Sequence, residues 1–189
     1  MPVAGYEIHG YAVVSDDDMI ADRDGRMPDA LRNDADRVHL RSELDRARIV
    51  VLGRITHERS PNLRRRPCIV LTRGVDGLAW NTGAWWWNPA TMPLRLVLDR
   101  TVPERGRIAA LGGQGVFDLI LSTAGFDAFH LTRIQGVTLP GGHAIFKATE
   151  CGETVESVFR FSGLEPGPSV QIDPKVPIDL TVWRRSGDT

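Results

Sequence analysis

The sequence of 189 residues has few cysteines, few lysines and no long apolar run. Its two cysteines, Cys68 and Cys151, belong to no C-x-x-C or Cys/His pattern. This usage predicts neither a disulfide framework nor a metal site, and it is typical of a reducing compartment. No apolar segment approaches membrane-spanning length, and the N-terminus lacks the pattern of a secretory signal. We therefore expect a cytoplasmic protein that does not contact a membrane.

Charge of either sign is not in excess. The chain has 23 basic and 24 acidic residues, which gives a formal net charge of −1. Because acids accompany the basic residues throughout, a nucleic-acid partner is disfavoured. Only Lys147 and Lys175 are lysines, so any local anion site would use arginine, whose planar guanidinium binds anions in a bidentate manner.

The length suits one α/β domain that spans residues 1–189. Short apolar runs next to Gly, Pro or polar residues predict buried strands, whereas Asn33 followed by spaced leucines predicts a capped helix. Glycines and prolines over residues 165–177 predict a loop. The expected strands are Tyr6–Ser15, Ile49–Leu52, Cys68–Leu71, Ile108–Leu111, Phe126–Ile134, Val155–Phe161 and Ile178–Arg184. The expected helices are Asn33–Ala47, Asn88–Thr101 and a segment after Gly115. Within the second of these, Leu94–Leu98 could also be a strand.

Two of the expected strands end in groups that can bind phosphate. The run Ile49–Leu52 leads into Gly53-Arg54-Ile55-Thr56, where the glycine allows close approach of a ligand to the backbone. The run Cys68–Leu71 leads into Thr72-Arg73, a hydroxyl and a guanidinium that suit a phosphate monoester. Ligands of open α/β sheets bind beyond the carboxyl ends of the strands, which is where both motifs fall.

A third turn has the same character. The strand Ile108–Leu111 ends in Gly112-Gly113-Gln114-Gly115, just before an apolar segment that predicts a helix. Consecutive glycines between a strand and a helix leave backbone amides free to bind a pyrophosphate. Taken alone, a Gly-Gly pair is most often a plain turn.

In their order and spacing these motifs resemble the dihydrofolate reductase superfamily, which includes the pyrimidine reductase domain of riboflavin biosynthesis. The resemblance covers roughly residues 6–146. It implies a three-layer α/β/α fold with a mostly parallel, mixed central sheet, and it implies NADPH as the cofactor. The cofactor-binding residues that it implies are Val14, Gly53, Arg54, Thr56, Thr72, Arg73, Gly112, Gly113, Gln114, Gly115 and Phe117.

The resemblance also suggests substrate residues, although less completely. Counting from Met27-Pro28 places Asp34 where dihydrofolate reductases keep the acid that hydrogen-bonds the pterin ring, so Asp34 is the implied catalytic residue. The expected Trp is Asp29, and the expected Phe is Val38. Asp34 could instead be a helix N-terminal carboxylate that the macrodipole favours.

Two further segments resemble the riboflavin-type substrate site. Arg41 ends an approximate H-x-L-R pattern, whose arginine meets the substrate phosphate in that branch, but it could also be a surface charge. Ser60, Leu63 and Arg66 match a D-P-x-L-x-x-R pattern in register, although a serine replaces its aspartate. Since serine is no carboxylate, this difference puts the riboflavin-type substrate in question.

The segment after the first strand resembles the S-x-D-G-x-I-A loop of the riboflavin-type reductases. Ser15, Asp17, Ile20 and Ala21 match, but Asp18 stands where the family has glycine. That position favours a positive φ, which Asp adopts less readily than Gly. In the family this loop closes over the nicotinamide, whereas the plain alternative is a solvated acidic turn.

Trp85, Trp86 and Trp87 follow one another, with Trp80 nearby. Three adjacent indoles cannot share one face of a strand, so at least one should be exposed or buried against another subunit. We expect a homodimer contact here, with a lid over an aromatic substrate as the alternative.

The function that the resemblance implies is that of an NADPH-dependent reductase that acts on a small nitrogen heterocycle. The resemblance is nearer to the riboflavin-pathway pyrimidine reductases, of the 5-amino-6-(5-phosphoribosylamino)uracil reductase type, than to dihydrofolate reductase, which is the alternative enzyme. A nucleotide-binding module without catalysis is the alternative of another class, supported by Ser60 and Asp29.

Overall fold

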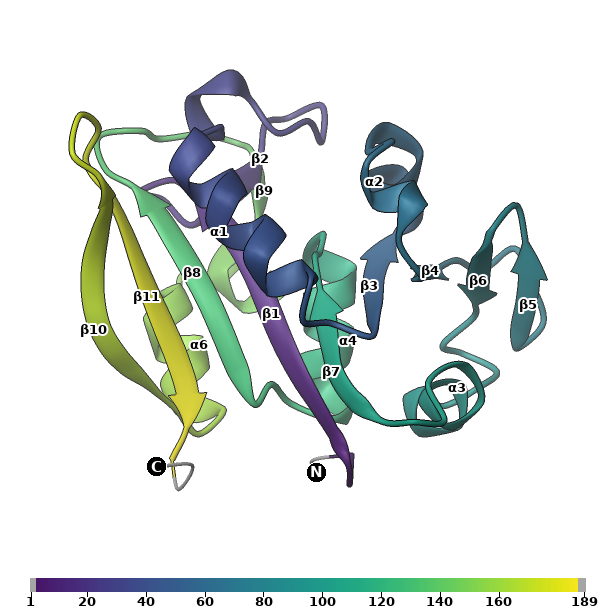
Figure 1. The fold of residues 1–189 in the computed structure, drawn as a ribbon. Coiled ribbons are helices and arrows are strands. Elements are labelled where there is room, and N and C mark those ends of the chain that lie inside the picture. Colours follow the sequence, from purple (N-terminus) through teal and green to yellow (C-terminus); the bar gives the residue numbers. More distant parts are fainter. Residues whose placement is uncertain (1–2, 187–189) are drawn as a thin grey trace.

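Nine strands form one twisted sheet across residues 3–186, the part of the chain that the computed structural model describes (Figure 1). Their order is β10-β11-β8-β1-β7-β3-β4-β6-β5, and β2 and β9 form a separate pair. The six strands from β8 to β6 run parallel, while β11 and β5 run antiparallel to their neighbours. Consecutive parallel strands require crossover connections, which here carry the helices.

The strands are β1 (Tyr6–Val14), β2 (Met19–Ala21), β3 (Ile49–Gly53), β4 (Cys68–Leu71), β5 (Leu78–Asn81), β6 (Ala84–Trp87), β7 (Gly106–Ala110), β8 (Ala128–Ile134), β9 (His143–Ala144), β10 (Leu164–Asp173) and β11 (Ile178–Arg185). The helices are α1 (Asp34–Leu44), α2 (Arg54–Arg59), α3 (Leu94–Thr101), α4 (Gln114–Thr123), α5 (Lys147–Glu150) and α6 (Val155–Phe161), and the 3-10 turns are η1 (Asp29–Leu31) and η2 (Leu63–Arg65).

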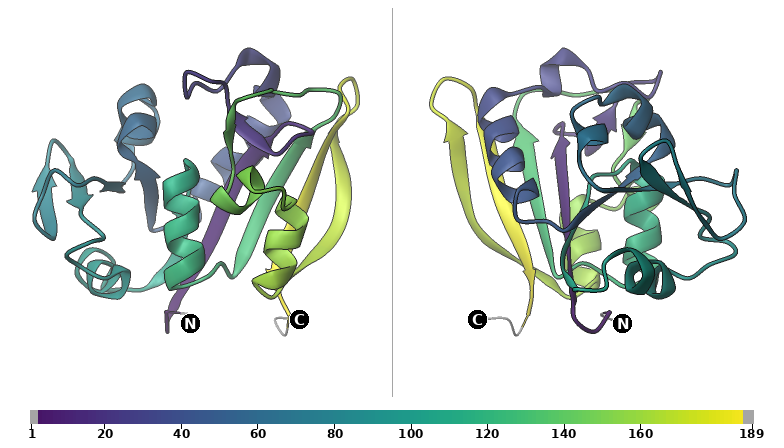
Figure 2. Two further views of the ribbon diagram at one scale, coloured as in Figure 1. Left: turned by 180° about the vertical axis from the view of Figure 1, so that it is seen from behind. Right: turned by 45° about the vertical axis from the view of Figure 1, so that its right-hand side comes forward.

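Helices cover both faces of the sheet, as the two views in Figure 2 show. Leu40 and Leu44 of α1 pack on one face, against residues of β1, β3, β4 and β7. The apolar sides of α3, α4 and α6 pack on the other face in a larger core. Buried phenylalanines, among them Phe117 and Phe129, contact one another edge to face in that core. The expected α/β/α fold class with a mostly parallel, mixed sheet is confirmed.

The sequence-based strands in the first two thirds of the chain agree with the structure to within a few residues. Three expectations are wrong. Val155–Phe161 is helix α6 rather than a strand, and the Thr154 side chain caps it by accepting from the Ser157 amide. The region 165–177, expected to be a loop, contains most of strand β10. Because β10 lies at the edge of the sheet, its prolines remove no ladder bond that the fold needs.

The third error concerns the helix expected from Asn88, because α3 begins only at Leu94. Asn88 instead organises the turn before it. Its side chain accepts from the Ala90 amide and donates to the Val75 carbonyl. Of the neighbouring indoles, Trp87 is fully buried, while Trp80 on the edge strand β5 is 59% exposed. The homodimer stays a prediction, and Trp80 is the indole that β5 presents to solvent.

Within residues 3–186, no helix combines the length and the apolar composition that crossing a membrane requires.

Candidate functional site

The three phosphate-binding motifs meet at the carboxyl edge of the parallel strands. Gly53, the last residue of β3, donates its backbone N–H to the Gly112 carbonyl over 3.0 Å. Gly53 also pairs with Leu71 of β4, so that Thr72 follows directly at the same edge. The Gly53 and Gly112 turns are therefore in contact, and Thr72 begins the next turn along the edge.

The glycine turn after β7 leads into the N-terminus of α4. The Gly112–Gly113 peptide bond is cis, and Gly112 has a φ of +74°. A Cβ at Gly112 would lie 2.8 Å from the ring of Phe117, so only glycine fits there. The first amide of the helix that bonds back is that of Val116, to the Gly113 carbonyl. The amides of Gln114 and Gly115 precede it and have no partner within the helix.

Phe117 and Val14, both implied as cofactor residues, lie with their side chains in the core. Phe117 packs beneath Gly112, where it supports the turn. Gln114 directs its side-chain amide to the Ala144 carbonyl and to Glu150. A ligand could therefore contact Val14 and Gln114 only through their backbone atoms. Phe117 could affect binding only indirectly, by supporting the glycine turn.

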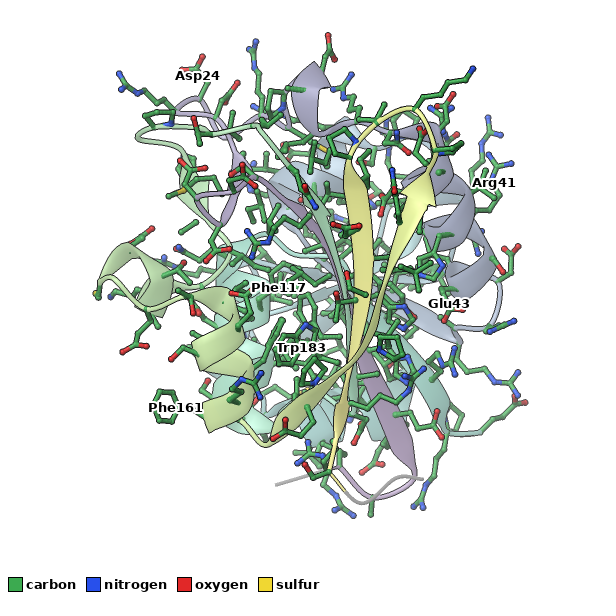
Figure 3. All side chains as sticks on the ribbon, turned by 90° about the vertical axis from the view of Figure 1, so that its left-hand side faces the viewer. Asp24, Arg41, Glu43, Phe117, Phe161 and Trp183 are labelled. Carbon is green, nitrogen blue, oxygen red and sulfur yellow. The ribbon has the colours of Figure 1, made fainter. Side chains whose placement is uncertain are left out.

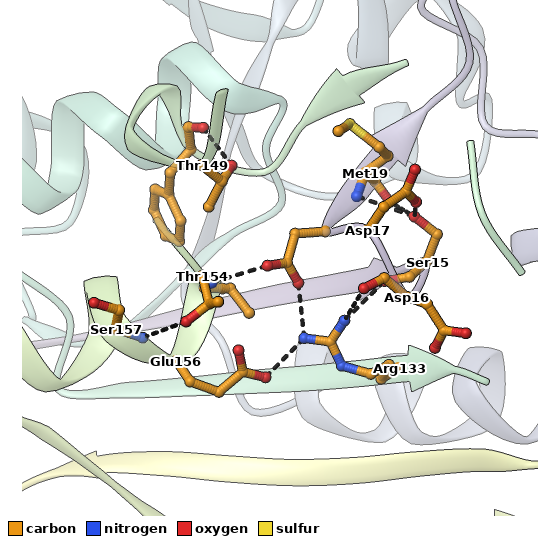
Figure 4. Close-up of polar contacts among 12 residues, drawn as sticks. Ser15, Asp16, Asp17, Met19, Arg133, Thr149, Thr154, Glu156 and Ser157 are labelled. Atoms are coloured by element: carbon orange, nitrogen blue, oxygen red, sulfur yellow. Dashed lines mark hydrogen bonds and ion pairs between the residues drawn. The ribbon is translucent and has the colours of Figure 1, made fainter. Parts of the chain in front are cut away.

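The segment after β1 folds over this turn. Ile20 of β2 approaches Gly113, with its Cδ1 atom 3.8 Å from the position of a Cβ there. Asp18 has a φ of +61°, which agrees with the positive φ expected at this position. Its carboxylate accepts from Arg133 on one oxygen, over 2.7 Å, and from the Val155 amide on the other, over 3.0 Å (Figure 4).

Arg133 holds the loop to the sheet and to α6. It donates to the Ser15 carbonyl over 2.8 Å and to Glu156 over 2.7 Å, in addition to Asp18 (Figure 4). Its two carboxylate partners raise the pKa of Arg133 against the lowering effect of burial. The Asp18 carboxylate is thus neutralised by a half-buried guanidinium and also bonded by a backbone amide.

Arg54 and Arg73, the two arginines predicted to bind a cofactor, have different surroundings. Arg54 on α2 pairs with Glu58 over 2.8 Å, one helical turn away. Arg73 is exposed and has no carboxylate partner within residues 3–186. The Thr72 hydroxyl accepts from the Gly74 amide over 3.0 Å, which leaves its own proton free to donate. Thr56 is half-buried on α2. Thr72 and Arg73 are therefore the better placed of these groups for an anion.

Asp34 occupies the first turn of α1 but points into solvent, where its side chain is 88% exposed and pairs with Arg37. Asp36, two residues later, is the carboxylate that faces the sheet. It accepts from the Thr132 hydroxyl over 2.5 Å, and burial raises its pKa against the lowering effect of that hydrogen bond. Thr132 pairs with Val13 near the carboxyl end of β1. The candidate acid at the edge is thus Asp36, which sequence reasoning missed.

The structure does not bring the remaining substrate candidates to this edge. Arg66 precedes β4, at the opposite end of the strand, and pairs with Asp45 beyond the end of α1 over 2.6 Å. Leu63 packs against the core on the α1 side, and the Ser60 carbonyl accepts from the Leu63 amide. Arg41 is exposed and points away from the sheet (Figure 3).

Three exposed apolar side chains lie on or beside helices α1 and α2, of which α2 stands above the carboxyl end of β3 in Figure 1. Met27 precedes α1, Val38 lies on α1 and Ile55 lies on α2, and their exposed fractions are 39%, 69% and 51%. Arg59 of α2 donates to the Gly25 carbonyl over 2.8 Å, which links α2 to the loop after β2. Ile55 of α2 is therefore an apolar group available to a flat heterocycle, whereas Val38 faces away from the side of α1 that carries Asp36.

A concave surface of about 320 Å³ lies elsewhere, between α6 and the strands β8, β10 and β11. Its arginines are already paired, Arg133 with Asp18 and Glu156, and Arg160 with Glu165. The surface therefore offers no free guanidinium to an anionic ligand, and we place the candidate site at the carboxyl edge.

A second polar group, which the sequence did not reveal, is buried between α1 and the sheet. We call it the histidine cluster, and it consists of His9, His39, Glu43 and His130. Burial, with a contribution from Arg107, lowers the pKa of His9 to about 4. Burial, with a contribution from His39, lowers the pKa of His130 to about 3.

No protein-family model matches the chain, and no curated protein is detectably similar in sequence. Solved structures are similar in fold. Dihydrofolate reductase from Enterococcus faecalis, complexed with NADP(H) and RAB-propyl, has a TM-score of 0.63 and 20% identity over 95% of this chain and 96% of its own. A putative riboflavin biosynthesis protein from Shewanella sp. PV-4 has a TM-score of 0.68 and 18% identity over 95% and 99%.

A third similar structure is the diaminohydroxyphosphoribosylaminopyrimidine deaminase/5-amino-6-(5-phosphoribosylamino)uracil reductase from Thermotoga maritima. Its TM-score is 0.60 and its identity 14%, over 95% of this chain and 56% of that longer chain. At these identities the likeness shows the fold, and the chain has the dihydrofolate reductase fold.

Asp36 provides a stability test of the site. Because the fold raises its pKa, the folded state holds this proton more tightly than the unfolded chain. The free energy of unfolding therefore falls as pH rises from the unfolded-state pKa of 3.8 through the higher folded-state pKa. At pH 7 the ionised Asp36 still destabilises the folded state. We expect Asp36→Asn to raise the free energy of unfolding at pH 7 by on the order of 1 kcal/mol, measured by urea denaturation.

Asp34→Asn is the matched control. It removes an exposed ion pair and a favourable first-turn charge, so it should leave stability unchanged or slightly lower. The gain for Asp36→Asn should also vanish below pH 3.5 or so, where the unfolded carboxyl is protonated as well. An Asp36→Asn variant no more stable than wild type at pH 7 would contradict the conclusion that the fold raises the pKa of Asp36.

Proposed function

We propose that this protein is an NADPH-dependent reductase of a small nitrogen heterocycle. The observation that carries the proposal is the contact between the Gly53 and Gly112 turns, with Thr72-Arg73 beside them and the half-buried Asp36 at the same edge. This arrangement combines groups for a dinucleotide with one ionisable group for a substrate. The fold shared with the Enterococcus faecalis enzyme, which was solved with NADP(H), supports the choice of cofactor.

The described residues fit such a cofactor. Gly115 has open space around the position of a Cβ, and with Gln114 it offers first-turn amides at the N-terminus of α4, which suit a pyrophosphate. Thr72 and Arg73 offer a hydroxyl and an unpaired guanidinium for the 2′-phosphate that distinguishes NADPH from NADH. When bound, NADPH supplies the hydride.

Asp36 supplies the proton chemistry in this proposal. A carboxyl with a raised pKa keeps more of its protonated form near neutral pH and can donate to a ring nitrogen. Thr132 fixes its orientation through the hydroxyl hydrogen bond. The exposed apolar side chain of Ile55 would contact one face of the ring and exclude water from it.

Two substrates are the main candidates. The sequence motifs favour a riboflavin-pathway pyrimidine, of the 5-amino-6-(5-phosphoribosylamino)uracil type named for the Thermotoga maritima protein. Arg66 lies too far from the edge to anchor the phosphate of that substrate. Dihydrofolate is the second candidate. Asp36, which Thr132 orients, can donate to its ring, and its ring carries no phosphate that an arginine would have to anchor.

The first test is NADPH oxidation with both substrates. We expect turnover with one of them and a loss of about 10²- to 10⁴-fold in kcat for Asp36→Asn, because a proton donor contributes that much. Asp34→Asn should retain wild-type kcat, since Asp34 points into solvent. NADPH binding by tryptophan fluorescence without turnover of either substrate would instead support a nucleotide-binding module without catalysis.

The second test concerns the choice between NADPH and NADH. Arg73→Ala should raise the Kd for NADPH by about ten- to a hundredfold, because it removes a charged hydrogen bond to the 2′-phosphate. The Kd for NADH, which lacks that phosphate, should not change. Arg100→Ala, an exposed arginine on α3, is the matched control. Equal losses for both cofactors in Arg73→Ala would place the arginine outside the 2′-phosphate site.

A further inference from the structure

The histidine cluster lies on the α1 side of the sheet, away from the candidate reductase site. His9 belongs to β1 and His130 to β8, and Glu43 approaches from the last turn of α1 (Figure 3). Their side chains are only 12%, 8% and 10% exposed. Glu43 is seven residues beyond Asp36 on the same helix, a separation of about 10 Å along its axis.

The cluster contains imidazole nitrogens that no hydrogen bond explains. His130 Nδ1 lies 3.0 Å from His39 Nε2, so one hydrogen bond joins these two rings. His130 Nε2 faces Glu43 Oε2 at 3.9 Å, which is too long for a hydrogen bond. His9 Nδ1 is fully buried and has no hydrogen-bond partner within residues 3–186. Buried polar atoms of this kind are normally satisfied.

A divalent cation would satisfy them. His9, Glu43 and His130 each offer one ligand atom, and these three atoms lie within 4.8 Å of one another. Ligands held 2.0–2.1 Å from a tetrahedral zinc ion are about 3.3–3.5 Å apart, so a modest contraction closes the site. We propose that His9, Glu43 and His130 form a binding site for a zinc-type divalent metal ion.

The surroundings supply the supporting contacts that metal ligands usually have. If His130 donates from Nδ1 to His39, its Nε2 lone pair is left free for the metal. Arg46 and Arg107 each donate to the Glu43 carboxylate over 3.0 Å, on different oxygens. The guanidinium of Arg107 also repels a cation, so we expect weaker binding than at closed four-ligand zinc sites.

The sequence gives no sign of this site, because its three ligands lie 34 and 87 residues apart. The parallel pairing of β1 with β8 brings His9 and His130 together, and the packing of α1 on the sheet adds Glu43. The expectation of no metal site rested on the absence of local Cys/His patterns. The proposal is independent of the reductase function, so its test uses metal binding rather than turnover.

The experiment is a calorimetric titration of the chelator-treated full chain with ZnCl₂. We expect one equivalent to bind, and we expect His9→Gln and His130→Gln each to weaken binding by at least about tenfold, as loss of a supporting or direct ligand does. His143→Gln, at an exposed position of β9, and Cys151→Ser, an exposed thiol, are the controls and should bind as wild type does.

A second measurement needs no variant. CoCl₂ titrated into the wild-type protein should shift or broaden the ring NMR signals of His9 and His130 before that of His143. Absence of zinc binding by the wild type, or equal binding by both cluster variants, would overturn the proposal. Loss of binding in Cys151→Ser would do so too, because it would assign the metal to a surface thiol.

Discussion

The parallel order of β1, β7, β3 and β4 is the constraint on which the candidate site depends. Parallel strands end at one edge, so turns that lie about twenty and about sixty residues apart in the chain become neighbours there. The hydrogen bond from the Gly53 amide to the Gly112 carbonyl fixes two of these turns against each other. Because Gly112 rests on the ring of Phe117, the position of the glycine turn is tied to the aromatic core.

Much of this fold could be predicted from the sequence because buried parallel strands are short, continuous apolar runs. The same signal misled at Val155–Phe161, which is helical because Thr154 caps it and because Val155, Val158 and Phe159 fall on one side and face the core. For residues 165–177 the prolines and glycines wrongly predicted a loop. Prolines are tolerated in β10 because it lies at the sheet edge, and a strand's place in the sheet is not visible in its own residues.

Part of the candidate site could likewise be predicted from the sequence, and part could not. The glycine and hydroxyl-arginine turns could be found from the sequence, because each is a contiguous motif whose surroundings are local. The candidate acid could not be identified from the sequence, because Asp34 and Asp36 are two residues apart on a helix and their side chains point in directions about 200° apart. Counting from Met27-Pro28 indicated the first, whereas the pairing with Thr132 of β8 identifies the second. The histidine cluster depends on the pairing of β1 with β8 and on the packing of α1 over them, and no local sequence motif indicates it.

The central claim is that these separate turns bind one dinucleotide, and a crystal structure with NADPH tests it most directly. The account predicts the pyrophosphate within hydrogen-bonding distance of the Gln114 and Gly115 amides, with the 2′-phosphate at Thr72-Arg73. It also predicts the nicotinamide on the side of the edge where Asp36 lies. NADPH bound at another surface, or a pyrophosphate without contact to the Gly112–Gly115 turn, would contradict it.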